Sequence, residues 1–160
     1  MRESAGQNPS AAPLRARLAL HCWRTGALGE ALEWIDSCLE IDGSNVSFYR
    51  IRANVLADMN QSIRAVRTAR RAVEAAPESV LARLLATRML LIDLQPSRAQ
   101  QALDAALDLD PDHQHLTMMK SLQEQILRMS REAEDHPLKW YSRKLKKRLA
   151  NVAAENHRSG

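Results

Sequence analysis

The residues best suited to chemistry are two histidines and two aspartates that lie close together in the sequence. His113 and His115 stand beside Asp110 and Asp112, and imidazole and carboxylate groups are ligands that Zn²⁺ uses in proteins. Side chains two positions apart point away from each other on a helix, so the two histidines would not converge on one ion. We expect Asp112 instead to cap the start of a helix, where its carboxylate accepts free backbone N–H groups. The pattern therefore predicts no metal site.

No other arrangement of residues predicts catalysis. The sequence has no Gly-rich phosphate-binding loop, no HExxH pair and no nucleophile elbow. The remaining histidines, His21, His136 and His157, are scattered along the chain. We therefore expect a non-catalytic protein that needs no cofactor.

The N-terminus and the cysteines predict where the protein resides. Residues 1–11 lack the apolar core of a secretory signal and are expected to form a disordered N-terminus. The sequence contains no run of about 18 apolar residues, which is the length that a helix needs to span a bilayer. We expect a cytoplasmic protein in which Cys22 and Cys38 are reduced and packed as small apolar side chains, with a disulfide between them as the alternative.

The positive charge of the chain is concentrated near its C-terminus. Between His136 and Ala154 there are six basic residues and no acidic one, in a chain with 23 basic and 19 acidic residues. The remainder has a slight negative balance, so its charge does not indicate nucleic-acid binding. The six basic residues are Lys139, Arg143, Lys144, Lys146, Lys147 and Arg148.

Residues 136–160 are expected to contain a basic amphipathic helix and a tail. Trp140 lies beside an apolar stripe on this helix, and the basic residues surround the rest of it. Three interpretations compete: a final helix packed on the protein with solvated cations, a contact with an anionic membrane or an acidic protein, and a phosphate contact with RNA or DNA. The third is the weakest, because no groove-reading motif accompanies the charge. The stripe consists of Leu138, Tyr141, Leu145, Leu149 and Val152.

Residues 112–135 are expected to form one continuous helix. Their apolar residues recur every three or four positions, which places them on one face. This face would cover the exposed end of the preceding helices, as terminal elements of a helical stack do. The apolar residues are Leu116, Met119, Leu122, Ile126 and Met129.

The preceding part of the chain repeats itself every 34 residues. A unit of this length accommodates two helices, which cannot bury their own apolar face and must share a core with stacked neighbours. Gly43, Pro77 and Pro111 close successive units. Small residues at fixed positions would allow close approach of the helices. They are Ala31, Ala65 and Ala99 in one series, and Cys38, Ala72 and Ala106 in a second.

The second half of each unit resembles the second helix of a tetratricopeptide repeat. Small residues stand seven positions apart with a larger residue between them, which is Ile35 or Leu103 but only Ala69 in the second unit. The resemblance covers residues 12–111. It implies an all-α protein, a right-handed α-solenoid of three antiparallel helical hairpins followed by capping helices.

The first helices resemble the family less closely. The usual aromatic residue is present as Tyr49, whereas Arg15 and Arg83 replace it in the other units. Arg52 and Ala86 also stand where leucine is usual. The small crossing positions fit the family and are Ala19, Ala53 and Thr87.

The resemblance also implies a binding site, because the first helices of this family line a concave groove. The expected groove is cationic at one end and apolar at the other. Arg50 and Asn54 match part of the family's carboxylate clamp, but Leu85 and Met119 replace its further polar residues, so a clamp for chaperone tails is not expected. The expected groove residues are Arg17, Arg24, Arg50, Asn54, Leu81, Leu84, Leu85, Arg88, Met118, Met119 and Leu122.

These features favour an adaptor or assembly factor that binds a protein segment with an acidic end and large apolar anchors. One alternative is a surface-recruitment protein, peripheral to a membrane, whose basic helix docks on a membrane-bound complex, anionic lipid or RNA. Another is a secretion-type chaperone for an export substrate, although such chaperones tend to be acidic. The C-terminal region could also fold back and fill the apolar end of the groove.

Overall fold

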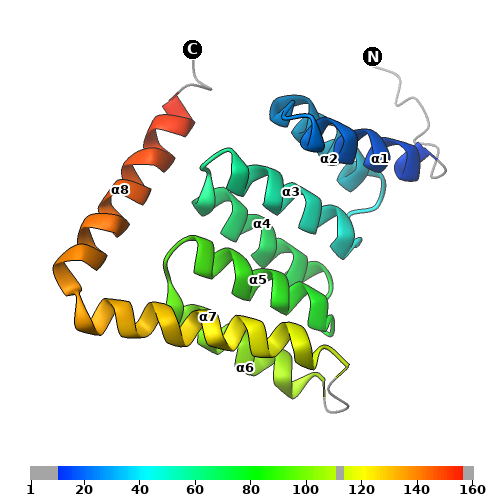
Figure 1. Cartoon of the computed structure of the whole chain (residues 1–160). Coiled ribbons are helices and arrows are strands. Elements are labelled where there is room, and N and C mark those ends of the chain that lie inside the picture. The colour runs from blue at the N-terminus through cyan, green and yellow to red at the C-terminus, as the bar shows by residue number, and fades with distance from the viewer. Residues whose placement is uncertain (1–10, 111–113, 157–160) are drawn as a thin grey trace.

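The structure is a computed structural model that describes residues 11–110 and 114–156. Within this part the chain forms eight α-helices and no strand, stacked as a solenoid of antiparallel hairpins (Figure 1). Residues 1–10 of the expected disordered N-terminus lie outside the described residues. Its last residue, Ala11, belongs to the first helix. The helices are α1 (Ala11–Arg24), α2 (Leu28–Ile41), α3 (Val46–Asp58), α4 (Ser62–Ala75), α5 (Val80–Ile92), α6 (Pro96–Asp108), α7 (Leu116–Asp135) and α8 (Pro137–Asn156).

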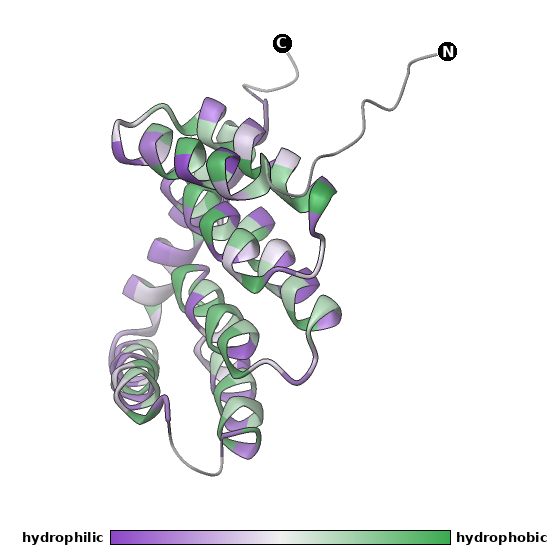
Figure 2. Ribbon diagram, turned by 90° about the vertical axis from the view of Figure 1, so that its right-hand side faces the viewer, coloured by the Kyte–Doolittle hydropathy of each residue, from purple (hydrophilic) through white to green (hydrophobic). Residues whose placement is uncertain are grey.

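Successive helices pack in the order of the chain. α1 pairs with α2, α3 with α4 and α5 with α6, and each pair also contacts the helix that follows it. Each helix of the stack carries both hydrophobic and hydrophilic residues (Figure 2), as expected of helices that bury one face. None of the described helices is long and apolar enough to cross a membrane.

The turns within the three hairpins share an unusual backbone conformation. Gly26, Asn60 and Leu94 lie one repeat apart and have φ values of 84°, 59° and 59°. Glycine adopts this left-handed region freely and asparagine tolerates it, whereas leucine does so at a cost. The 34-residue period of the small helical residues is therefore also present in the backbone conformation of the turns.

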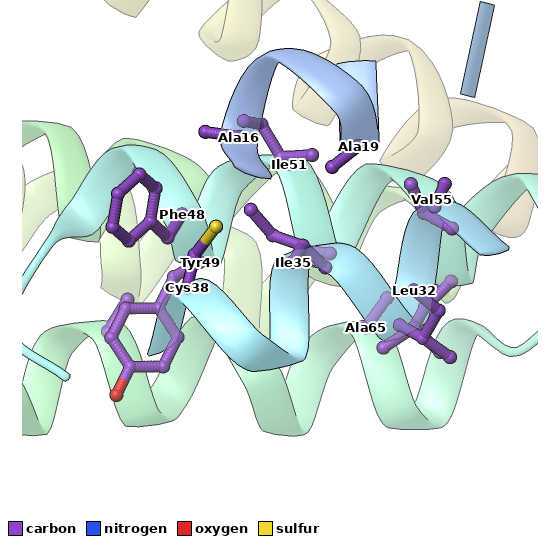
Figure 3. Packing of buried hydrophobic residues seen from close by; sticks show 14 of the residues in the cluster. Ala16, Ala19, Leu32, Ile35, Cys38, Phe48, Tyr49, Ile51, Val55 and Ala65 are labelled. Atoms are coloured by element: carbon purple, nitrogen blue, oxygen red, sulfur yellow. The ribbon is translucent and has the colours of Figure 1, made fainter. Parts of the chain in front are cut away.

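The predicted close crossings are fully buried. Ala31, Ala65 and Ala99 have no exposed surface, and Ile35 of α2 lies in the same apolar cluster as Ala19 of α1 (Figure 3). Small side chains at these points let the helix backbones approach closely, which supports the register derived from the 34-residue period.

A second apolar cluster joins α5 and α6 to α7. Met119, Leu122 and Ile126 of α7 are buried in it together with Leu103 of α6. α7 therefore covers the end of the last hairpin with the stripe expected to do so. α7 begins at Leu116, because Gln114 and His115 form a turn before it. Residues 111–113 lie outside the described part of the chain.

Two arginines in the first helices make specific polar contacts. Arg83 donates to the carbonyl of Pro77 at 3.1 Å, as the hydroxyl of Tyr49 donates to the carbonyl of Gly43 at 2.9 Å one repeat earlier. Arg83 thus stands at the position of the family's usual aromatic residue and makes the hydrogen bond that Tyr49 makes one repeat earlier. Arg52 similarly joins neighbouring units, because its guanidinium lies 2.6 Å from Asp36 of α2.

Candidate functional site

A groove of about 960 Å³ runs between α3, α5 and α7. Helical spacing explains its composition, because residues three or four positions apart on α5 and α7 face the same side. No residue of α8 is among those that line it, so the described part of the basic C-terminal helix does not fill the groove. The expected groove residues that line it are Arg50, Leu81, Leu84, Leu85, Arg88, Met118 and Leu122.

The groove has an apolar floor and a cationic edge. Leu84, Leu85 and Leu122 are nearly buried at its base, whereas Leu81 and Met118 are about half exposed. Arg50 and Arg88 are exposed as well, and the described lining residues include no acidic side chain. Such a surface can bury large apolar side chains and pair with carboxylates. It has no pair of groups arranged for acid–base or nucleophilic catalysis.

Four of the expected groove residues do not line this groove. Arg17 and Arg24 are exposed on α1, outside it. Asn54 is only 5% exposed on α3, and Met119 is 2% exposed because it packs in the second apolar cluster. The family pattern is therefore correct for α3, α5 and α7 but not for α1, which does not line this groove. The burial of Asn54 and Met119 depends on the packing of neighbouring helices.

Five further residues line the groove that were not predicted from the sequence. They lie within one helical turn of predicted residues, on the same faces of α3 and α7, so helical spacing could have found them. These residues are Val46, Ser47, Thr117, Ser121 and Gln125.

The basic helix α8 contacts the rest of the protein through polar side chains and Trp140. Asn151 is 1% exposed, and its Oδ1 accepts the backbone N–H of Ile63 at 3.2 Å. Arg148 lies 3.4 Å from the buried carboxylate of Asp93. Trp140 is the only large apolar residue of the described α8 that is buried.

The other cations of α8 differ in how far they are exposed to solvent. Arg143 lies 2.7 Å from Glu132 of α7 and over the ring of Trp140, and its side chain is half exposed. Lys139 and Lys146 are exposed. Lys144 and Lys147 are partly buried.

The apolar stripe of α8 faces away from the protein. The helix does pack on the protein, as one of the three interpretations expected, but through its polar side and Trp140 and not through this stripe. Its polar side packs inward because Asn151 and Arg148 meet buried polar partners there. The exposed fractions are 86% for Leu138, 70% for Tyr141, 61% for Leu145, 60% for Leu149 and 53% for Val152.

The histidine and aspartate cluster acts as a helix cap through Asp110. Its carboxylate accepts the backbone N–H groups of Gln114 at 3.0 Å and His115 at 2.9 Å, just before α7. The hydrogen bond from His115 is the main cause that lowers the pKa of Asp110, and burial opposes it. Asp112 and His113 lie outside the described residues. Among the residues described, no cluster of histidine, cysteine or acidic side chains could hold a metal ion.

Both cysteines are buried and free. The Cys38 thiol donates to the carbonyl of Ala12 at 3.5 Å, and burial raises its pKa. These residues therefore pack as small apolar side chains, as expected, and form no disulfide with each other.

Comparisons with solved structures identify the fold. The first TPR domain of human RPAP3 matches with a TM-score of 0.68 at 15% identity, over 81% of this chain and 99% of that chain. A yeast Sti1 TPR2B domain in a complex with pHsp70 matches at 0.65 and 17% identity, over 78% and 97%. The Yersinia enterocolitica type III secretion chaperone SycD, with a peptide of the translocator YopD, matches at 0.63 and 14% identity, over 77% and 95%.

Sequence comparisons add no relative: no family model matches the chain, and no curated protein matches it. The structural likenesses are at low identity and show the fold alone. The chain thus has the fold of a tetratricopeptide-repeat domain, a solenoid of helical hairpins with a groove on the side of the first helices.

Proposed function

We propose that the protein is a non-catalytic adaptor or assembly factor that binds a segment of another protein in the groove between α3, α5 and α7. The observation that carries this proposal is the pairing of an apolar floor with exposed arginines, in a groove whose described lining has no acidic residue. As part of the same proposal, the adaptor acts in the cytoplasm.

The chemistry of the groove selects the class of segment. Leu84, Leu85 and Leu122 offer an apolar base for large side chains, and the flexible side chain of Met118 can adapt to different shapes. Arg50 and Arg88 can each form paired hydrogen bonds with a carboxylate. The preferred ligand is therefore a segment with large apolar anchors and acidic residues beside them.

Similar folds with bound peptides support this proposal. The Sti1 domain is described as a complex with pHsp70, and SycD as a complex with a peptide of YopD. The SycD likeness also favours a second version, a chaperone that holds a segment of an export substrate. Coexpression with export substrates tests this version, which fails if none becomes more soluble.

Affinity capture with the full chain tests the groove. Proteins retained by the unaltered chain are identified by mass spectrometry, and capture is repeated with Leu81→Asp and Arg88→Glu in the groove. Leu14→Asp and Arg131→Glu are controls, since Leu14 and Arg131 are exposed and do not line the groove. We expect one partner to be kept by both controls and lost by both groove variants. Equal capture by groove and control variants would contradict the proposal.

A further inference from the structure

The outward direction of the α8 stripe is set by a buried polar cluster. Ser62, Asp93 and Asn151 are each 2% exposed or less. Asn151 Nδ2 donates to Ser62 Oγ at 3.0 Å, and Ser62 Oγ donates to Asp93 Oδ1 at 2.6 Å. Turning α8 to bury its leucines would leave these groups without partners, which is unfavourable in the interior. The apolar side is therefore held toward solvent.

The outward stripe is continuous, unlike single exposed apolar residues, which are normal on protein surfaces. It runs from Leu138 to Val152 along most of α8, and each of its five members is more than half exposed. α8 lies along the edge of the stack (Figure 1), and none of its residues lines the groove. The stripe is thus a second surface, separate from the one proposed to bind a protein segment.

Cations border this stripe on both sides. At 100° per residue, Lys139 and Lys146 lie on one flank and Lys144 on the other. Arg148 also lies on the second flank, where it pairs with Asp93 of the protein. No acidic residue occurs between His136 and Ala154. Two copies of α8 packed through their stripes would bring like charges together, so charge complementarity favours an anionic partner over a second copy.

We propose that α8 is an interfacial helix that docks on an anionic lipid bilayer. A straight apolar stripe flanked by lysines matches a helix lying in the plane of a membrane surface, where the leucines enter the acyl boundary. The lysine side chains can reach the headgroups while their stems lie along the apolar surface. This proposal is independent of the groove and would attach the repeat domain to a membrane without a spanning segment.

Vesicle flotation with the full chain tests the proposal. The probes are vesicles of phosphatidylcholine alone and vesicles that also contain about 30% phosphatidylserine, a source of negative surface potential. We expect flotation with the anionic vesicles only, and a decrease as salt is raised. Equal flotation with both vesicle types, or with neither, would overturn the proposal.

Matched variants test which surface binds. Leu145→Asp should lower partitioning at least about tenfold, because a charged group replaces an inserting side chain. Leu14→Asp on α1 is its control, since Leu14 and Leu145 are both 61% exposed. Thermal melts should show both variants folded, because neither side chain is in the core. Equal partitioning of the two variants would overturn the proposal.

Charge reversals provide a second, independent comparison. Lys139→Glu combined with Lys146→Glu should lower partitioning about tenfold or more. Lys120→Glu combined with Arg131→Glu reverses two exposed cations of α7 and should leave partitioning close to that of the unaltered chain. Binding of an acidic protein, RNA or a second copy that Leu145→Asp abolishes, without vesicle binding, would assign the stripe to that partner and overturn the lipid proposal.

Discussion

Asn151 of α8 and Ser62 of α4 lie 89 positions apart in the sequence and hydrogen-bond to each other, with Asn151 Nδ2 3.0 Å from Ser62 Oγ. Asn151 also donates to the carbonyl of Lys147 at 2.8 Å and accepts the backbone N–H of Ile63 at 3.2 Å. The contacts with Ser62 and Ile63 join α8 to α4 in the middle of the solenoid. They explain why an amphipathic helix presents its polar side to the protein.

Replacing Asn151 tests this anchor. Asn151→Ala should lower the free energy of unfolding by about 1–3 kcal/mol, because buried groups on α4 lose their partner. Asn156→Ala at the exposed end of α8 is the control and should have little effect. Denaturant unfolding measures both, and equal stability of the two variants would mean that the anchor contributes nothing.

Overpacking tests the helix crossings. Ala65→Leu and Ala99→Leu should each lower the free energy of unfolding by about 1–3 kcal/mol, because both positions have no exposed surface. Ala153→Leu on the exposed side of α8 should leave the free energy of unfolding nearly unchanged. Unchanged melting temperatures for the first two variants would show that the close crossings lie elsewhere.

Two glycines near the first turn should respond to alanine in opposite directions. Gly26 has a φ of 84°, so Gly26→Ala should destabilise the protein by about 1–2 kcal/mol although no atom lies within 4 Å of the added Cβ. Gly29 lies in α2 and is equally free of close contacts, so Gly29→Ala should stabilise by up to about 1 kcal/mol. Chemical denaturation distinguishes the two, and destabilisation by both would refute the backbone explanation.

Acid should weaken the start of α7. Backbone N–H groups lower the pKa of Asp110, so its contribution to stability is present above the unfolded pKa of about 3.9 and is lost as the pH falls through the lower folded value. Asp110→Asn should therefore reduce the change in melting temperature between neutral pH and pH values below about 4. Asp108→Asn is an exposed control on α6. The same pH response in both variants would argue against the cap.

Removal of α8 should leave the solenoid folded. The two apolar clusters contain no residue of α8, so a chain ending at Asp135 should remain helical and unfold cooperatively. Its melting temperature should fall only modestly, because Ser62 and Asp93 lose partners that water can replace. Circular dichroism melts of the two chains measure this difference. Aggregation or loss of cooperative melting in the shorter chain would show that α8 is required for folding.

The 34-residue period by itself determined most of the solenoid. Ala31, Ala65 and Ala99 are small because helix backbones approach closely there, and this local requirement is visible in residue type alone. The turn conformation at Leu94 was not predictable, because leucine rarely adopts a positive φ and does so here within the repeated turn geometry.

The resemblance to the repeat family indicated the faces of α5 and α7 that line the groove, because the family's pattern assigns positions within a single helix. It did not determine that Asn54 and Met119 would be buried, because burial depends on the neighbouring helices. The same limit applied to α8. Its sequence determined that an apolar stripe exists, but only the tertiary structure decided that the stripe faces outward. The reason is that Asn151 and Arg148 are held against the solenoid by Ser62 and Asp93, which are distant in the sequence.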